Sequence, residues 1–249
     1  MLVNICLFYE NEIGKPLARN DERAKHILRI LHKNVGDEFS AGVINGKAGI
    51  ARITSITSDA LSFDFSANEK QKKLFPITLL LGFPRPIQLK RILRDASSLG
   101  VAEIILAGTE LGEKSYLQSS LSNERAIFSY LLAGAEQAAS TLLPKCSIAE
   151  NVERAIEMLS ETQKASETVN IVLDVENAAY PLSEFLKSKC ANEKNIVLAI
   201  GSERGWTKNE RALFQKNNYN TCSLGKRILK TETATLSAIA IALSHFGEM

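Results

Sequence analysis

The first part of the chain, to about residue 70, alternates short apolar runs with polar turn residues, a pattern that predicts β-strands. Asn45-Gly46 stands between two of these runs, and this dipeptide favours a tight hairpin turn. One run instead has its apolar residues at helical spacing, with Asn20 or Asp21 placed to cap its start. We therefore expect a small β-barrel with one inserted helix. Its strands are expected at residues 3–8, 38–44, 48–56 and 60–65.

Beyond Pro76 the rhythm changes, because longer apolar runs alternate with amphipathic segments of helical period. Continuous apolar runs are typical of parallel strands that are covered on both faces. Thr207 and Glu210 have the spacing of a capping box at the start of a helix. These features predict an α/β domain with strands at residues 77–81, 101–106, 170–175 and 195–200, and helices at residues 87–99, 124–139, 152–161, 181–189, 207–216 and 231–245.

The charged run at residues 69–73 is typical of an exposed linker, so we divide the chain into domains at 1–72 and 73–249. The final helix of the second domain should bury one apolar face against the sheet. The residues expected on that face are Leu236, Ile239, Ala240 and Leu243.

Composition indicates an ordinary globular protein and does not by itself indicate a function. With 249 residues, of which 45% are hydrophobic and 23% charged, the chain can bury a sizeable core. No apolar run approaches the roughly 20 residues of a membrane helix, and residues 1–12 lack a charged segment before an apolar run. We therefore expect a cytoplasmic protein with no membrane partner. The net charge of +2 does not by itself indicate a nucleic-acid partner.

The four cysteines are scattered along the chain, with no C-x-x-C pair among them. This spacing predicts neither a zinc site nor a disulfide framework, so we expect reduced, buried thiols and no bound metal. These residues are Cys6, Cys146, Cys190 and Cys222.

Two segments remain as candidates for chemistry after the common nucleotide and zinc motifs are found to be absent from the sequence. One of them follows the strand predicted at residues 195–200, and open α/β sheets bind their ligands at such strand ends. The first is the loop Gly201-Ser-Glu-Arg-Gly205, whose glycines allow a close approach of the backbone to a ligand. The alternative is a plain connection between strand and helix. The second segment, residues 222–234, combines a glycine turn with three cations and a hydroxyl-rich helix start, and its alternative is a solvated helix cap.

Together these segments resemble the SPOUT methyltransferases that modify N3 of a uridine in 16S (small-subunit) ribosomal RNA. That family has a G-P-E-G-G-like loop followed by L-G-x-R-I-L-R-x-E-T-A, and residues 224–234 here read LGKRILKTETA. Shorter matches extend the resemblance over nearly the whole chain: Leu99-Gly100-Val101, Glu136-Gln137, His26-x-x-Arg29 and Gly36-Asp37. Departures from the family pattern stand at Ser202, Arg204, Lys230, Asp95, Ser98, Ser140 and His32.

The resemblance implies a C-terminal SPOUT domain with a deep trefoil knot and an N-terminal PUA-like β-barrel that binds RNA. It implies S-adenosylmethionine as cofactor, ribosomal RNA or the small ribosomal subunit as partner, and a homodimer. The last helix, which carries Leu236, Ile239 and Leu243, is the expected dimer surface. Cofactor contacts are expected from Leu173, Ile200, Gly201, Gly205, Leu224, Gly225, Ile228 and Leu229.

Methyl transfer to a uridine nitrogen requires loss of the imide proton, so a carboxylate or a nearby cation can assist. Glu232 and Glu203 are the candidate bases, and Arg227 and Lys230 the candidates for stabilising the anion. Alternatively, Glu232 only complements the dipole of its helix and Arg227 forms a surface ion pair or a phosphate contact.

The inserted helix of the first domain concentrates cations, which can hold phosphates without reading sequence. The residues expected there to bind RNA are Lys25, His26, Arg29, His32 and Lys33, and the linker adds Lys70, Lys72 and Lys73. A merely solvated face is the alternative.

Two other functions stay open: a non-catalytic RNA-binding relative, or a methyltransferase with a different RNA target. A small-molecule enzyme on an α/β sheet is a more distant reading.

Overall fold

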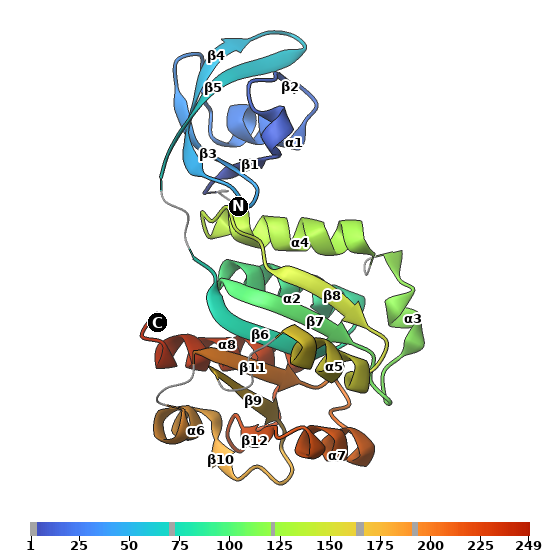
Figure 1. Ribbon diagram of the computed structural model, residues 1–249. Helices are drawn as coiled ribbons and strands as arrows, with labels where there is room; N and C mark the ends of the chain where they lie inside the picture. The colour runs from blue at the N-terminus through green and yellow to red at the C-terminus, as the bar shows by residue number, and fades with distance from the viewer. Residues whose placement is uncertain (1–3, 70–72, 121–122, 163–166, 191–193) are drawn as a thin grey trace. The chain divides into compact units, whose positions relative to one another are not determined.

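The computed structural model describes residues 4–69, 73–120, 123–162, 167–190 and 194–249. It divides into two compact units, which are described separately. Unit 1 comprises the residues up to Lys73 together with Leu132–Leu143, and unit 2 comprises Leu74–Leu131 and Pro144–Met249. Figure 1 shows the elements of each unit.

Unit 1 is built on a five-stranded sheet with the order β1-β3-β4-β5-β2. The sheet ends at β1 and β2, so it forms a half-barrel, and β1 and β3 are its only parallel neighbours among the described pairs. Apolar residues of its inner face, Phe8, Ile53, Leu61 and Phe63 among them, form one buried cluster. The strands are β1 (Cys6–Phe8), β2 (Leu17–Ala18), β3 (Glu38–Val43), β4 (Ala48–Ile56) and β5 (Ala60–Glu69).

The predicted Asn-Gly hairpin joins β3 to β4, and Asn45 has a positive φ of 56°. Within unit 1 this turn is held by the segment 132–143: the Asn45 side-chain oxygen accepts from the Leu143 backbone N–H at 3.0 Å, and the Thr141 hydroxyl donates to the Gly46 carbonyl at 2.6 Å. A turn with a positive φ is therefore fixed by side-chain hydrogen bonds that local sequence does not reveal.

The predicted helix of unit 1 begins at Asp21, whose side chain accepts from the Arg23 N–H at 2.8 Å. Only α1 (Glu22–Lys25) is a regular α-helix, because a π-helical turn, η2 (His26–Ile30), follows it at once. The helix prediction is confirmed, whereas the π-helical turn was not predicted. Such turns insert an extra residue and change which side chains face inward.

Unit 2 is a seven-stranded parallel sheet with the order β10-β12-β9-β11-β6-β7-β8. Its helices lie along both faces of the sheet (Figure 1). The strands are β6 (Phe75–Gly82), β7 (Val101–Ala107), β8 (Lys145–Ala149), β9 (Thr168–Leu173), β10 (Tyr180–Pro181), β11 (Asn195–Ile200) and β12 (Asn220–Ser223). The helices are α2 (Pro86–Ser98), α3 (Lys114–Leu117), α5 (Val152–Thr162), α6 (Leu182–Lys189), α7 (Lys208–Lys216) and α8 (Thr231–His245), while α4 (Glu124–Gln137) runs from unit 2 into the segment that belongs to unit 1.

The α/β class predicted for this part is confirmed, and several elements differ from their expected bounds. Strand β9 ends at Leu173, because Asp174 binds backbone N–H groups of its own turn rather than extending the strand. Strands β8, β10 and β12 were not predicted. On α8, Ile239 and Leu243 are buried as expected, but Leu236 and Ala240 are only partly buried.

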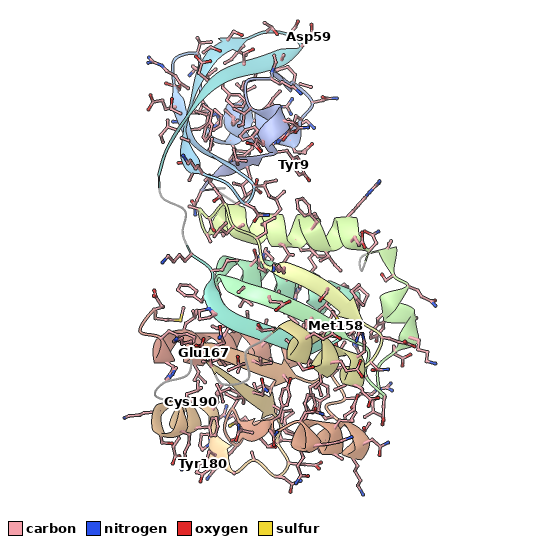
Figure 2. The ribbon with its side chains drawn as sticks, viewed as in Figure 1. Tyr9, Asp59, Met158, Glu167, Tyr180 and Cys190 are labelled. Carbon is pink, nitrogen blue, oxygen red and sulfur yellow. The ribbon has the colours of Figure 1, made fainter. Side chains whose placement is uncertain are left out.

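All four cysteines are free thiols, as predicted. Three of them, Cys6, Cys190 (labelled in Figure 2) and Cys222, are buried, and Cys146 is partly exposed. Burial raises the pKa of Cys6 to about 12, so this thiol is protonated at neutral pH. Among the described helices, none has the length and apolar character needed to cross a membrane. The same residues contain no cluster of three or more potential metal ligands.

Candidate functional site

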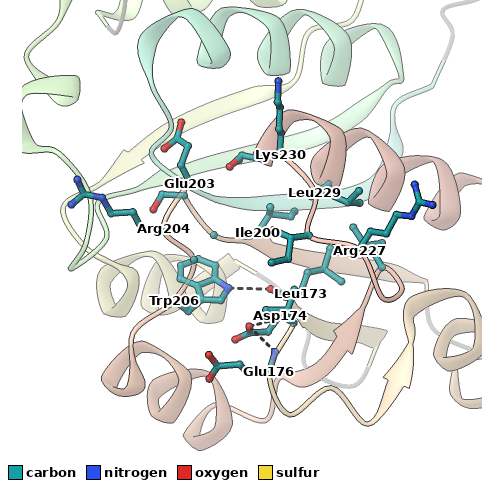
Figure 3. Close-up of a pocket in the computed structure, with 18 of the residues that line it drawn as sticks. Leu173, Asp174, Glu176, Ile200, Glu203, Arg204, Trp206, Arg227, Leu229 and Lys230 are labelled. Atoms are coloured by element: carbon teal, nitrogen blue, oxygen red, sulfur yellow. Dashed lines mark hydrogen bonds between the residues drawn. The ribbon is translucent and has the colours of Figure 1, made fainter.

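A pocket of about 690 Å³ lies where three neighbouring strands of unit 2, β12, β9 and β11, reach their carboxyl ends (Figure 3). Ligand sites of parallel sheets form at this edge, because loops leave all the strands on one side. The pocket is lined by the end of β9, the loop after β11, the segment before α8 and the start of α2. All eight residues expected to contact a cofactor lie in its wall: Leu173, Ile200, Gly201, Gly205, Leu224, Gly225, Ile228 and Leu229.

The loop after β11 is shaped by its two glycines for different reasons. Gly205 has a φ of +68°, which side chains rarely allow, and its N–H donates to the Ser202 carbonyl at 2.9 Å. Gly201 is constrained by space, since a Cβ there would lie 3.0 Å from the Gly205 Cα. The loop therefore folds back on itself, and its residues Gly201–Gly205 line the pocket.

Trp206, which sequence reasoning missed, ties this loop to the neighbouring strand. Its indole Nε1 donates to the Leu173 carbonyl at 3.2 Å, and its ring packs edge-on against Phe214 at 4.8 Å between centroids. Figure 3 shows the indole beside the end of β9. The indole N–H thus fixes the spacing between two pocket-lining segments.

An ion pair that sequence reasoning also missed, between Asp174 and Arg211, lies in the pocket wall at the end of β9. The Asp174 carboxylate, only 6% exposed, accepts from the Arg211 Nε at 2.6 Å and from the Val175 N–H at 2.7 Å. Hydrogen bonding to Asp174 raises the pKa of Arg211 further above its ordinary range. Arg211 also lies 3.1 Å from Glu176. Asp174 lies inside the strand predicted at residues 170–175, and a charged residue near the end of an apolar run was the only local signal, because its partner is on α7.

The predicted capping box of α7 is confirmed, and its glutamate has a second task. The Glu210 N–H donates to the Thr207 hydroxyl at 3.1 Å, and Glu210 accepts from the Thr207 N–H at 2.8 Å. The other Glu210 oxygen accepts from the Glu110 N–H at 2.9 Å, and the residue is 2% exposed. This carboxylate therefore binds two loops together at the base of the site.

Three of the four predicted catalytic residues line the pocket: Glu203, Arg227 and Lys230. The Glu203 Oε1 accepts from the Arg85 N–H at 2.9 Å, at the start of α2. In Figure 3 the side chains of Glu203 and Lys230 extend to the same side of the pocket, whereas Arg227 extends away from them. Glu203, Arg227 and Lys230 are all exposed, so a substrate can reach them.

Glu232, the fourth predicted catalytic residue, is not part of the pocket wall. It lies in the first turn of α8, with its Oε1 3.7 Å from Arg91 Nη1 on α2. Its Oε2 is buried and has no hydrogen-bond partner. A role for Glu232 thus involves α2, which the sequence did not suggest.

The predicted RNA-binding residues of unit 1 fall into two groups. Arg29 and His32 are exposed, and Lys33 is partly exposed. Lys25 forms an ion pair with Glu22, and the Nε2 of His26 is buried without a hydrogen-bond partner. Burial lowers the pKa of His26, so this side chain is less readily charged than an exposed histidine. Lys73 is among the described residues, while Lys70 and Lys72 lie outside them.

Arg204, a departure from the family loop, is engaged within the protein. Its guanidinium lies 3.2 Å from the Glu113 carboxylate and donates to the Leu111 carbonyl at 3.4 Å. Ser202, a second departure, is buried and its hydroxyl accepts from Thr109 at 3.3 Å. Both substitutions are accommodated by contacts to the loop that follows β7.

Family models and known proteins match the chain in both units. Residues 70–243 match the model of an RNA methyltransferase domain, and residues 20–66 match that of an RNA methyltransferase PUA domain. The chain is 41% identical to ribosomal RNA small subunit methyltransferase E of Treponema pallidum, over 98% of this chain and 91% of that protein. It is 33% identical to ribosomal RNA small subunit methyltransferase E 1 of Borreliella burgdorferi, over 99% of this chain and 100% of that protein.

Solved structures share the fold at lower identity. A ribosomal RNA small subunit methyltransferase E from Neisseria gonorrhoeae, bound to S-adenosyl methionine, superposes with a TM-score of 0.74 at 22% identity, covering 97% of each chain. A probable rRNA methyltransferase from Porphyromonas gingivalis superposes with a TM-score of 0.77 at 19% identity, covering 96% of this chain and 98% of that one. These two likenesses extend the sequence matches to the fold of both units.

Proposed function

Because this chain belongs to the ribosomal RNA small subunit methyltransferase E family of SPOUT-type RNA methyltransferases, we propose that it methylates N3 of a uridine in 16S ribosomal RNA. The proposed methyl donor is S-adenosylmethionine. The observation that carries the proposal is the pocket at the ends of β9, β11 and β12, whose wall contains both segments singled out in the sequence.

The pocket fits an adenosine-containing cofactor through its shape and its chemistry. Apolar side chains from three separate segments, Leu173, Ile200 and Leu229, offer surfaces for a flat base. Glycine at position 201 lets the loop Gly201–Gly205 fold tightly in the pocket wall, because a Cβ there would lie against the Gly205 backbone. We propose that these groups hold the cofactor mainly by backbone contacts, which tolerates the substitutions at Ser202 and Arg204.

The cofactor would supply a methyl group already activated on a sulfonium, so the protein's task is alignment and handling of one proton. Arg227 and Lys230 would stabilise negative charge that develops on the uracil oxygens as the N3 proton leaves. Glu203 is the predicted base that lines the pocket, and its second oxygen is the one able to take a proton, since Oε1 accepts from the Arg85 N–H. Glu232 would act as base only from its position against α2.

We propose that residues 1–72 form an RNA-positioning domain and that residues 73–249 form the methyltransferase domain. The exposure of Arg29 and His32, with part of Lys33, supports phosphate contacts from unit 1. The ion pair of Lys25 and the buried Nε2 of His26 favour supporting roles for these two residues.

A homodimer is also proposed, with a revised surface. On α8, Ile239 and Leu243 already pack inside unit 2, so they do not form an outer apolar face. At the pocket edge, however, Ile228 is 88% exposed and Val175 is 66% exposed. A second copy of the chain would remove these apolar side chains from water.

The proposal also includes a trefoil knot in the methyltransferase domain. It further includes a cytoplasmic location, where ribosomal RNA would be the partner.

Calorimetry and a methylation assay test the proposed function together. S-adenosylhomocysteine should bind the purified protein, and 16S ribosomal RNA or small subunits from a strain that lacks the enzyme should gain a methyl group at a uridine, detected by nucleoside mass spectrometry. Absence of cofactor binding would contradict the enzyme assignment. Binding of cofactor and RNA without methyl transfer would favour the non-catalytic alternative, and methylation of another base would identify a shifted target.

A further inference from the structure

Helix α2 presents three polar side chains at helical spacing on the side that meets the pocket and α8. Arg85 stands at the N-cap position, Gln88 lies in the first turn, and Arg91 follows one turn later. Arg85 and Gln88 line the pocket, and Arg91 lies against Glu232 of α8. The two helices pack against each other in unit 2. This row of side chains, Arg85, Gln88 and Arg91, is termed the α2 row below.

The ion pair between Arg91 and Glu232 leaves hydrogen-bonding groups of both side chains without a protein partner. The two atoms are 3.7 Å apart, beyond hydrogen-bond distance, and the Arg91 side chain is 62% exposed while that of Glu232 is 19% exposed. The buried Glu232 Oε2 has no hydrogen-bond partner. A buried carboxylate oxygen without a hydrogen-bond partner lowers the stability of the fold, and the positive end of the α8 dipole offsets only part of this loss. The pair therefore orients Arg91 while leaving most of its guanidinium open to solvent.

Gln88 provides an independent observation on the same row. Its side-chain oxygen Oε1 is buried and lacks a hydrogen-bond partner, although the residue lines the pocket. An amide oxygen can only accept, so the group that completes it must be a donor. Exposed guanidiniums flank Gln88 on both sides, and a guanidinium forms its strongest hydrogen bonds with anionic acceptors such as phosphate.

An RNA backbone supplies both kinds of group in alternation. Its phosphates are anionic acceptors, and its ribose 2′-hydroxyl is a donor that DNA lacks. We propose that the α2 row is the contact for the RNA strand beside the target nucleotide: Arg85 and Arg91 bind phosphates, Gln88 accepts from a ribose 2′-hydroxyl, and Glu232 is a positioning residue that acts through Arg91. This inference rests on the proposed function, because it takes RNA as the substrate.

The charge around the pocket agrees with this path. Lys230 and Arg227, both exposed, lie on the segment before α8, so a strand following α2 would pass cations from two elements before a base enters the pocket. At the end of β9, by contrast, Asp174 and Glu176 share the single cation Arg211, so this side of the pocket keeps one uncompensated negative charge and does not attract a phosphate chain. The backbone therefore approaches from the α2 side.

The test compares Arg91→Ala with Arg94→Ala in the full-length protein. Arg94 continues the spacing of the row by one more turn, but its guanidinium is paired with Asp95 at 2.8 Å and the residue is not part of the pocket wall, so it matches Arg91 in helix and charge without a free contact for RNA. RNA affinity is measured by filter binding with a 16S fragment over a range of salt. Arg91→Ala should weaken RNA binding about tenfold, and lower the salt slope by about 1. Arg94→Ala should change neither the RNA affinity nor the salt slope. Both variants should keep the unaltered protein's affinity for S-adenosylhomocysteine.

The positioning role of Glu232 is tested by coupling. Glu232→Gln should weaken RNA binding less than Arg91→Ala does, and the double variant should bind no more weakly than Arg91→Ala alone. Arg91→Lys should recover part of the lost affinity, since a cation remains. Gln88→Met should leave binding of an all-deoxy fragment unchanged while reducing the preference for RNA over DNA.

Two results would overturn the inference. Equal RNA affinity in Arg91→Ala and Arg94→Ala would show that the row does not contact RNA. A loss of single-turnover rate in Glu232→Gln at saturating RNA, with a changed pH profile and unchanged RNA affinity, would make Glu232 a base rather than a positioning residue. Both results remain distinguishable from failure of the proposed function, which would appear as absence of cofactor binding in the unaltered protein.

Discussion

At the scale of single residues, the loop at Gly201–Gly205 leads to the first prediction. Gly205→Val forces a β-branched residue to a φ of +68°, and Gly201→Val places side-chain atoms against the Gly205 backbone, 3.0 Å from the first added carbon. Each variant should lower affinity for S-adenosylhomocysteine at least about tenfold, since backbone strain of about 1–3 kcal/mol disrupts the loop. Calorimetry measures the effect.

Gly247 provides the matched control for this loop. It has a φ of +74° with no atom near its absent side chain, and it lies beyond the end of α8 rather than in the pocket. Gly247→Val should therefore bind the cofactor normally despite comparable strain. Unchanged affinity in both loop variants would show that Gly201–Gly205 is only a connection between β11 and α7.

A second prediction concerns Arg23 and the dependence of stability on pH. Hydrogen bonds from Arg23 hold the pKa of Glu12 and that of Asp21 below their ordinary values of 4.5 and 3.8. Because both folded-state pKa values are lowered, this stabilisation is complete above the ordinary values and is lost as the pH falls through the lowered ones. The free energy of unfolding should therefore decrease as the pH falls below 4.5.

Replacement of the guanidinium tests that cause. Arg23→Met should lower the free energy of unfolding at pH 7 and make it less sensitive to acid, as measured by urea titration followed by circular dichroism. Arg19→Met, at an exposed arginine of the same unit, should leave the acid sensitivity unchanged. An unaltered acid dependence in Arg23→Met would assign the sensitivity to other carboxylates.

At the scale of elements, the start of α7 gives the third prediction. Thr207→Ala removes a cap and should lower the free energy of unfolding by about 1 kcal/mol. Glu210→Ala should lower it further, because the N–H groups of Thr207 and Glu110 both lose their acceptor in a buried place. Lys208→Ala, an exposed change in the same turn, is the control. Urea titration that ranks Thr207→Ala as more harmful than Glu210→Ala would contradict the second role given to Glu210.

The same scale shows what periodicity can and cannot predict. Strands β6, β7 and β11 were predicted because they are buried on both faces and so are continuously apolar. Strands β8 and β10 are the two edges of the sheet, and β12 lies next to one of them. The edge strand Lys145–Ala149 is partly exposed, and Asn220–Ser223 has four residues of which one is buried, so both carry little apolar signal.

The candidate site was predictable to the extent that it is encoded locally. The glycine loop and residues 224–234 are continuous in sequence, and their residues meet in one pocket. Arg91 and Glu232 are 141 positions apart, and Asp174 and Arg211 are 37 apart, so only the packing of α2 on α8 and of α7 beside β9 brings them together. The segment 132–143 likewise supports the hairpin of unit 1 through contacts that no local pattern records.

At the scale of the whole molecule, the proposed dimer gives the fourth prediction. Analytical ultracentrifugation at micromolar concentration should show a species of twice 27.3 kDa. Ile228→Glu should dissociate it, because the exposed isoleucine would be replaced by a charge in the interface. Val35→Glu, an exposed apolar position in unit 1, should leave the dimer intact. A monomeric unaltered protein would exclude the dimer.

Trp206 is the only tryptophan of the chain, which makes it an intrinsic optical label. Its indole is buried against the end of β9 in unit 2, while unit 1 has none. Its fluorescence spectrum should therefore respond to an adenosine ligand that alters the contact with Leu173, without a dye or an engineered probe. During denaturation, the same emission follows unit 2 alone, and far-ultraviolet circular dichroism follows both units. A difference between the two transitions would reveal whether the units unfold independently.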